Sequence, residues 1–166
     1  MSNYCNRTLI GKGPTLLLIL AAAAFLTACS DDRLPPGELA HGQEPYLRWC
    51  ASCHGNRGEG KPPAFPPMVD SEWLELPDQA LALIVLNGLR GEIEVAGRTY
   101  RGYMPPMQHL SDDDVAAIIS YIVSTWGGRE PLLDAAGVAS LRQAFPGRQP
   151  PLEGMEGVER ALEELP

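Results

Sequence analysis

Apolar residues recur at helical spacing most clearly in SDDDVAAIISYIVSTW, residues 111–126. The residues on the apolar face of this stretch are Val115, Ile118, Ile119, Ile122 and Trp126. Ser111 is a favourable N-cap, and the three aspartates after it suit the positive end of a helix dipole. Because two glycines follow Trp126, the pattern predicts a helix that ends there.

Two earlier stretches also favour helices. Residues 37–54 carry an apolar face at helical spacing, and Pro45 suits a first helical turn. Residues 76–88 begin with a proline at a similar position, Pro77, and end in Asn-Gly. Between these two helices, the sequence KPPAFPPM (61–68) contains four prolines. It therefore predicts an extended loop rather than a helix or a central strand.

The remaining segments carry weaker patterns. Residues 92–100 alternate polar and apolar side chains and predict a small hairpin or an extended loop. In the tail, residues 129–166, we expect short helices at 134–145 and 157–166, separated by glycines and prolines. Together the elements predict an all-α fold with three to four core helices and a small hairpin or loop.

Residues 1–28 have the pattern of a bacterial signal peptide. Arg7 and Lys12 form a positive region, and LLLILAAAAFL (16–26) is an apolar run of 11 residues. That run is too short to span a bilayer, which takes about 20 apolar residues. We therefore expect export and removal of this segment.

The end of the signal resembles the lipobox of bacterial lipoproteins. The sequence LTAC (26–29) predicts cleavage before Cys29 and acylation of that cysteine. Residues 29–37 would then form a tether to a bacterial membrane on its periplasmic side, with inner and outer membrane both open. The alternative is an ordinary signal peptide that happens to end near a cysteine.

The charge balance excludes one class of partner. The formal net charge is -8, and because Arg7 and Lys12 leave with the signal, the chain from Cys29 onward has a net charge of -10. An acidic domain is repelled by polyanions, so we do not expect nucleic acid as a ligand.

Few cysteines remain for the mature domain. Of the four, Cys5 lies in the signal peptide and Cys29 is the predicted lipid site, which leaves Cys50 and Cys53. One pair cannot form a disulfide framework. In an oxidising compartment a bare pair would close on itself unless it has a redox or cofactor role.

The pair belongs to the cluster WCASCHGNRGEG (49–60), in which His54 follows directly. A structural zinc site needs four ligands, and the cluster supplies three, two of them adjacent. A thioredoxin-like dithiol expects strands and helices in alternation, which the surrounding pattern lacks. Covalent haem fits better, because Cys-x-x-Cys-His is the attachment pattern of c-type haem. Cys50 and Cys53 would bind the porphyrin, and His54 would bind its iron.

An electron-carrying haem needs a sixth ligand to iron, and methionine opposite histidine raises the potential. Met104 starts MPPM (104–107), where two prolines stiffen the chain before the last predicted core helix. Met104 is our first choice, and Met107 on the same loop is the alternative. Met68 follows the proline-rich loop and is expected to pack on the haem. Ligation by His109 is a further alternative.

The motifs together resemble those of a class I c-type cytochrome. The resemblance runs from about residue 37 to residue 127. It includes GxxxYxxxCxxCHG from Gly42, FPPM (65–68), the segment 82–107 with MPPM, and the final helix ending in SYIVSTWGG. It implies a cytochrome c fold over residues 38–128, followed by an acidic extension at 129–166. The pattern is most similar to small cytochromes, or cytochrome domains, that serve periplasmic dehydrogenases and reductases.

The resemblance also implies roles for individual residues. The first and last helices should cross near Gly42 and Tyr121, with Tyr46 packed there. Pro66 should accept a hydrogen bond from His54 through its carbonyl group. Three residues are expected at the haem, namely Met68, Tyr100 and Trp126. At the position of Met68 the family usually has leucine. Arg98 and Arg101 are expected either beside the propionates or simply in solvent.

We expect a non-enzymatic electron carrier with one covalent haem c, redox proteins as its donor and acceptor, and the lipid as its membrane contact. With both axial positions filled, the iron would only change oxidation state. One alternative is a subunit fixed to a dehydrogenase or reductase complex, docked through the C-terminal helices. Another is a haem enzyme in which Met104 is displaceable.

Overall fold

The computed structural model describes residues 39–146 and 149–166. The predicted signal peptide, the predicted lipid site Cys29 and the predicted tether lie outside the described residues. The elements are α2 (Gln43–Trp49), α3 (Ala51–His54), η1 (Glu72–Glu75), α4 (Asp78–Asn87), β1 (Leu89–Val95), β2 (Arg98–Met104), α5 (Asp112–Trp126), α6 (Ala135–Ala144), β3 (Leu152–Glu153) and α7 (Gly154–Glu163). In the described part of the chain, no helix is both long and apolar enough to cross a membrane.

The domain is mostly helical, but it is not all-α as the sequence pattern predicts. The described residues form six α-helices and a three-stranded sheet with the order β2-β1-β3. The predicted helix at 37–54 is shorter, because the chain enters α2 through Gly42 in the left-handed conformation. The predicted helices at 76–88 and 111–126 are present as α4 and α5, with ends that differ by one or two residues.

Helices α2 and α5 cross at Gly42, as expected. A Cβ atom on Gly42 would lie 1.9 Å from the carbonyl oxygen of Ala117, so only glycine allows this approach. The ring of Tyr46 packs beside the crossing, with its centroid 5.3 Å from that of Tyr121 and 5.2 Å from that of Trp126. Tyr46 is fully buried, and its hydroxyl donates to the carbonyl of Gly55 at 2.7 Å. The crossing therefore fixes the chain just before and just after the cysteine pair.

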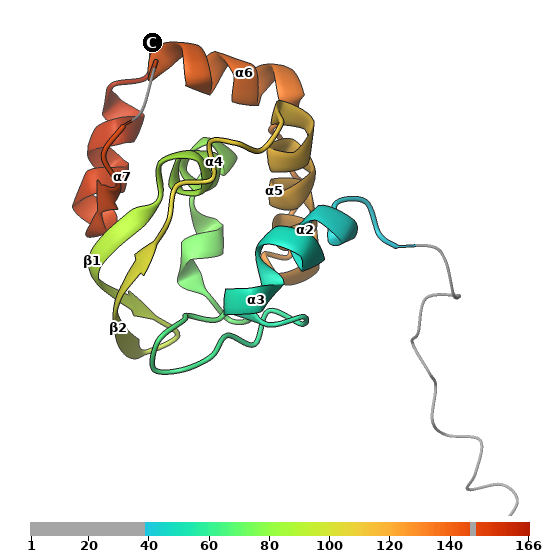
Figure 1. Ribbon diagram of the computed structural model, residues 1–166, viewed down its shortest axis with the longest axis vertical. Helices are drawn as coiled ribbons and strands as arrows, with labels where there is room; N and C mark the ends of the chain where they lie inside the picture. The colour runs from blue at the N-terminus through green and yellow to red at the C-terminus, as the bar shows by residue number, and fades with distance from the viewer. Residues whose placement is uncertain (1–38, 147–148) are drawn as a thin grey trace, which may run out of the picture. The chain divides into compact units, whose positions relative to one another are not determined.

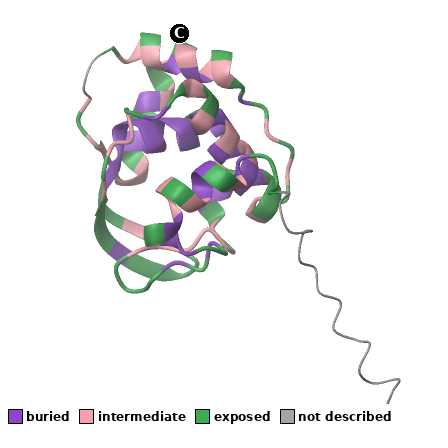
Figure 2. Ribbon diagram, turned by 45° about the vertical axis from the view of Figure 1, so that its right-hand side comes forward, coloured by how far each residue is buried: buried purple, intermediate pink, exposed green. Residues whose placement is uncertain are grey.

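Helix α4 is the central element of the core (Figure 1). All of its residues except Gln79 are buried, and α5, α6 and α7 all contact it. Figure 2 shows these buried residues along its length, whereas the outer faces of the other helices are exposed. A helix that is apolar on every side is stable only when other elements surround it.

The weakly predicted hairpin is real and longer than its sequence pattern indicates. Strands β1 and β2 pair antiparallel from Leu89↔Met104 to Val95↔Arg98. The two loop residues between them, Ala96 and Gly97, both have positive φ angles, of 50° and 69°. Such turns match the twist of a two-stranded ribbon. The register places Met104 at the end of β2, beside the first residue of β1.

The C-terminal extension is part of the core rather than an appendage. Helix α6 packs against α4 and α5, and α7 packs against α4 and β1. Strand β3 pairs parallel with β1 at Leu89↔Leu152 and Arg90↔Glu153. Val138 of α6 and Val158 of α7 are both fully buried. The extension therefore supplies core side chains that residues 38–128 lack by themselves.

A buried ion pair fastens the start of this extension. Asp78, whose side chain is 1% exposed, lies 2.6 Å from a guanidinium nitrogen of Arg129. The same guanidinium donates to the carbonyls of Leu74 and Leu76 at 3.2 and 2.7 Å. Asp78 also accepts hydrogen bonds from the backbone N–H groups of Leu132 and Leu133. Because a charge removed from water needs such partners, this contact fixes the chain that follows α5.

Candidate functional site

His54 closes the short helix α3, and its imidazole is 9% exposed. Its Nδ1 atom lies 2.9 Å from the carbonyl oxygen of Pro66, as expected from the sequence. A carbonyl only accepts hydrogen bonds, so Nδ1 carries the proton and Nε2 of the neutral ring keeps its lone pair. Burial lowers the pKa of His54, and the hydrogen bond to Pro66 opposes that shift in part. The ring is therefore neutral near pH 7 and able to bind a metal through Nε2.

The proline-rich loop returns to α3 through backbone hydrogen bonds. The N–H groups of Met68 and Val69 both donate to the carbonyl of Gly58, at 2.7 and 3.1 Å. The N–H of Gly60 donates to the carbonyl of His54 at 2.7 Å. These bonds hold the loop against α3. They position the Pro66 carbonyl beside the imidazole, although the loop contains no helix or paired strand there.

Both cysteines are free thiols and are partly buried. Burial, together with the nearby Cys53, raises the pKa of the Cys50 thiol to about 12. A redox-active dithiol needs a lowered thiol pKa, so the environment of Cys50 does not suit a thioredoxin-like role. Within residues 39–146 and 149–166, no group of three His, Cys, Asp or Glu side chains is arranged to hold a metal ion.

The cluster opens onto a cavity of about 330 Å³. Cofactor and ligand sites occupy roughly 300–1,000 Å³ and are mostly apolar. Here α4, the hairpin, the proline-rich loop and the loop after β2 supply the walls, most of them aliphatic, aromatic or proline side chains. The predicted site residues that line the cavity are Cys50, Cys53, His54, Pro66, Met68, Tyr100, Met104 and the alternative Met107.

The loop after β2 brings both distal candidates to this cavity. Met104 ends β2, and the N–H of Met107 donates to the carbonyl of Val85 in α4 at 2.9 Å. Two thiols, an imidazole with a free Nε2 and three thioethers thus line one apolar cavity, and two of the thioethers lie on the loop after β2. This donor set fits a c-type haem, which needs two thiols for attachment and two axial ligands to iron.

Three predicted residues lie away from the cavity lining. Trp126 packs on Tyr46 and Tyr121 in an aromatic cluster instead. Arg98 is exposed, and Arg101 pairs with Glu92 across the hairpin at the surface. The structure thus places Trp126 at the helix crossing and both arginines at the surface.

The alternative histidine ligand is also displaced from the cavity. His109 is exposed, and its ring packs edge-on against Trp49 with a centroid separation of 5.0 Å. Among the described residues that line the cavity, the one histidine is His54.

The sequence pattern did not single out Arg90, which does line the cavity. Arg90 lies in β1, where the sequence pattern had no strand, and pairs with Glu153 of β3 at 3.0 Å. Arg90 could have been found from the alternation of polar and apolar side chains in the hairpin, if the predicted strand had been extended by three residues towards the N-terminus.

Comparison with known proteins identifies the family. The cytochrome c family model matches residues 39–126, more than half of the chain. Cytochrome c-552 of Thermus thermophilus is 40% identical over 92 residues, which cover 53% of this chain and 70% of that protein. A second cytochrome c-552, from a particular strain of the same species, is also 40% identical, and 62% of its length is covered.

More distant relatives belong to larger proteins. The cytochrome c subunit of the quinone alcohol dehydrogenase of Gluconobacter oxydans is 28% identical over 109 residues, which cover 23% of that protein. The family implies covalent haem c, and the single Cys-x-x-Cys-His motif allows one haem. The chain belongs to the cytochrome c family, as a mono-haem member.

Proposed function

We propose that this protein is a membrane-tethered electron carrier, with His54 and Met104 as the axial ligands of its haem iron. The observation that carries the proposal is that two free thiols, a neutral imidazole hydrogen-bonded to Pro66, and Met104 all line one apolar cavity. Bound haem c supplies a reversible one-electron couple between ferric and ferrous iron. The protein supplies attachment, axial ligands and an apolar surrounding.

The residues of α3, together with Cys50 directly before it, would hold the haem from the His54 side. Cys50 and Cys53 would form the two thioether links, and Nε2 of His54 would bind the iron. The hydrogen bond to the Pro66 carbonyl fixes the ring orientation and increases the electron density on Nε2. Met68 and Tyr100 would pack against the macrocycle, since both line the cavity.

Met104 is preferred to Met107 as the distal ligand because it belongs to the β1–β2 ladder, where it pairs with Leu89, whereas Met107 lies in the loop and is held by hydrogen bonds to Val85 and Leu110. Pro105 and Pro106 then restrict the chain that follows. A thioether is neutral and polarisable, so it favours ferrous iron more than a second imidazole would.

Substitution of the two methionines tests this assignment. In the parent ferric protein we expect the weak charge-transfer band of a sulfur-to-iron bond. Met104→Ala should abolish this band and lower the reduction potential, whereas the matched control Met107→Ala should keep the band. If the band persists in Met104→Ala and is lost in Met107→Ala, the distal ligand is Met107. If the parent lacks the band, methionine ligation is wrong.

The carrier role is preferred to a haem enzyme. Peroxide cleavage would use a distal histidine with a nearby arginine, and His54 is the one histidine among the described residues that line the cavity. Both relatives named cytochrome c-552 match this chain over 92 residues at 40% identity, which supports the role of a small cytochrome.

The tether rests on the sequence of residues 1–37. In the proposal, residues 1–28 are removed, Cys29 is acylated, and residues 29–37 link the lipid to the domain on the periplasmic side of a membrane. Cys29→Ala should release the exported protein from the membrane fraction and end its labelling by a radioactive fatty acid. If Cys29→Ala still sediments with membranes, the lipid is not the anchor.

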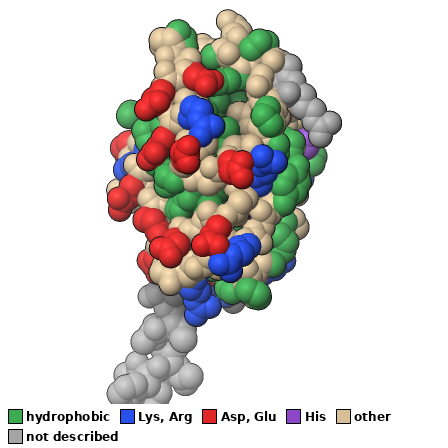
Figure 3. Space-filling view, turned by 90° about the vertical axis from the view of Figure 1, so that its left-hand side faces the viewer, with side chains coloured by type: hydrophobic (Ala, Val, Ile, Leu, Met, Phe, Trp, Pro, Cys, Tyr) green, Lys and Arg blue, Asp and Glu red, His purple; other side chains and the backbone are tan. Residues whose placement is uncertain are grey.

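The partners would be an electron donor and an electron acceptor with basic or neutral docking faces. Asp and Glu side chains gather on the face that Figure 3 shows, with a few Lys and Arg side chains among them. A negative surface increases the association rate with a basic partner and repels an acidic one.

A fixed place in an enzyme complex is the second candidate. The cytochrome c subunit of a quinone alcohol dehydrogenase favours it, because that relative is itself a subunit. The exposed side of α7, with Glu159 and Glu163, would then contact the complex. Co-purification with a membrane enzyme at high salt would support this candidate, and free exchange between partners would support the mobile carrier.

A further inference from the structure

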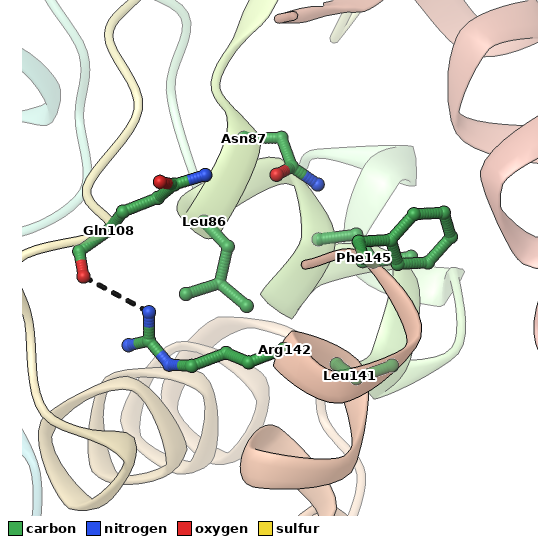
Figure 4. A pocket seen from close by; sticks show the side chains of 7 residues that line it. Leu86, Asn87, Gln108, Leu141, Arg142 and Phe145 are labelled. Carbon is green, nitrogen blue, oxygen red and sulfur yellow. Dashed lines mark hydrogen bonds between the residues drawn. The ribbon is translucent and has the colours of Figure 1, made fainter. Parts of the chain in front are cut away.

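Arg142 connects the C-terminal extension to the loop that carries Met104 and Met107. It lies on α6, and its guanidinium makes three contacts outside that helix. Nη1 donates to the carbonyl of Gln108 at 3.0 Å, as Figure 4 shows, and Nη2 donates to the carbonyl of Leu110 at 2.5 Å. Nε lies 2.6 Å from the Asp112 carboxylate, so the contact is also an ion pair.

The acceptors follow MPPM without a gap. Gln108 comes directly after Met107, Leu110 lines the haem cavity itself, and Asp112 opens α5. Pro105 and Pro106 restrict the chain between Met104 and this segment, so a shift at one end moves the other. Arg142 therefore holds the chain immediately beyond the distal methionine.

Packing alone does not hold this part of the loop against α6. A second cavity of about 270 Å³ lies between α4, α6 and the loop, lined in part by Leu86, Asn87 and Phe145 (Figure 4). Where this space lies, α6 and the loop do not pack directly against each other. Arg142 spans the edge of this cavity with hydrogen bonds from a charged donor. Such bonds are stronger than hydrogen bonds between neutral groups.

We propose that Arg142 is a positioning residue that keeps the distal methionine on the haem iron and so limits access of outside ligands. The proposal rests on the proposed function, in particular on ligation by Met104. In the closed state the guanidinium holds the Gln108 and Leu110 carbonyls in place. In an open state these bonds break, the loop moves, and the methionine leaves the iron. Arg142 lowers the population of that open state.

Imidazole binding to the ferric protein measures this population. Imidazole can bind only when methionine has left, so its apparent affinity scales with the open fraction. One charge-assisted hydrogen bond changes an equilibrium by about tenfold or more. We therefore expect Arg142→Ala to bind imidazole about tenfold more tightly than the parent, and Arg142→Lys to fall between the two.

Arg129 offers a matched control. It is exposed to the same degree as Arg142, at 30% against 29%, and likewise binds two carbonyls and an aspartate at the start of a helix. Its partners are Leu74 and Leu76, before α4, and Asp78, the first residue of α4, so none of them belongs to the methionine loop. We expect Arg129→Ala to lower the midpoint of urea unfolding at least as much as Arg142→Ala, with imidazole affinity unchanged.

The outcomes separate this inference from the function on which it rests. If the parent has the sulfur-to-iron band but Arg142→Ala binds imidazole like the parent, the inference fails and the function stands. Equal gains in affinity for the two arginine variants would show general loosening and would also overturn it. A parent without the band removes the function and the inference together.

If Arg142→Ala does not fold, Asp112→Asn serves in its place. That variant removes the ion pair and leaves both carbonyl bonds to Arg142. It should increase imidazole affinity by a smaller factor, about threefold. An affinity equal to that of the parent would contradict the proposal.

Discussion

Gly42 illustrates how one residue sets the geometry of the site. The backbone of α5 passes so close to Gly42 that a methyl group there would overlap the carbonyl of Ala117. The approach buries Tyr46, whose hydroxyl reaches Gly55, the residue after His54. Burial raises the pKa of Tyr46, so the hydroxyl remains a donor at any physiological pH.

Gly42→Ala should lower the free energy of unfolding by about 3 kcal/mol or more, because it combines a positive φ with a backbone clash. Gly97→Ala is the matched control. Gly97 has a similar φ of 69°, but nothing lies within 4 Å of a Cβ atom there. It should cost only about 1 kcal/mol. Urea unfolding measures both, and equal losses would contradict the close approach.

Tyr46→Phe should lower the free energy of unfolding by about 1–2 kcal/mol, because the Gly55 carbonyl then loses a buried donor. The ring contacts with Tyr121 and Trp126 remain in this variant. Tyr103→Phe is the control, since Tyr103 is 57% exposed and should change stability by less than about 0.5 kcal/mol. If the two variants unfold at the same urea concentration, the hydrogen bond contributes nothing.

Among the elements, those with local sequence signals were predictable. Helix α5 has a capping serine, a periodic face and glycines beyond it, and the structure places it one residue from the predicted start. The cysteine pair, His54 and the Pro66 contact follow from a local motif and its family resemblance. The fold class was predicted only in part, because the sequence pattern indicated a small hairpin or an extended loop at 92–100, whereas the paired strands run from Leu89 to Met104 and a third strand joins them.

Strand β3 could not be predicted from local pattern. It has two residues and pairs with β1 some sixty positions earlier in the chain. The pattern did not single out Arg90 or predict the packing of Trp126 against Tyr46 and Tyr121, since both depend on contacts between distant segments. Side-chain contacts between different elements determine where such residues lie. The spacing of apolar residues along the chain carries little information about those contacts.

Removal of α6, β3 and α7 should unfold the domain. The extension supplies Val138, Leu141, Val158 and Ala161 to the core, and α4 and β1 would be exposed without it. Deletion of residues 134–166 should therefore remove most of the free energy of unfolding, which is about 5–15 kcal/mol for a typical domain. Circular dichroism during heating measures this. A cooperative transition at the parental temperature would show that residues 39–133 fold alone.

The expected unfolding of the truncated chain changes how docking through the C-terminal helices can be tested. Deleting the extension would remove docking and folding together, so the loss of electron transfer would have two explanations. Neutral substitutions of exposed residues on α7, such as Glu159→Gln and Glu163→Gln, leave the buried face intact. Unchanged reduction by every partner in this double variant would end the docking hypothesis.

At the scale of the whole molecule, charge governs encounters with partners. The chain from Cys29 onward carries a net charge of -10. Oxidation of the ferrous protein by a small cationic complex, such as hexaamminecobalt(III), should slow several-fold as ionic strength rises from about 0.01 to 0.15 M. Oxidation by anionic hexacyanoferrate(III) should accelerate over the same range. Stopped-flow rates that show the same salt dependence for both reagents would contradict steering by the acidic surface.

The central claim is that both axial positions of the haem iron are filled by His54 and a methionine, so that the protein carries electrons without binding substrates at iron. Exposure of the ferrous protein to carbon monoxide tests it most directly, because this gas binds ferrous haem wherever an axial position is open. We predict that the visible spectrum of the parent stays unchanged under carbon monoxide, while that of Met104→Ala shifts to the spectrum of an adduct. Rapid formation of the adduct by the parent protein would contradict the claim.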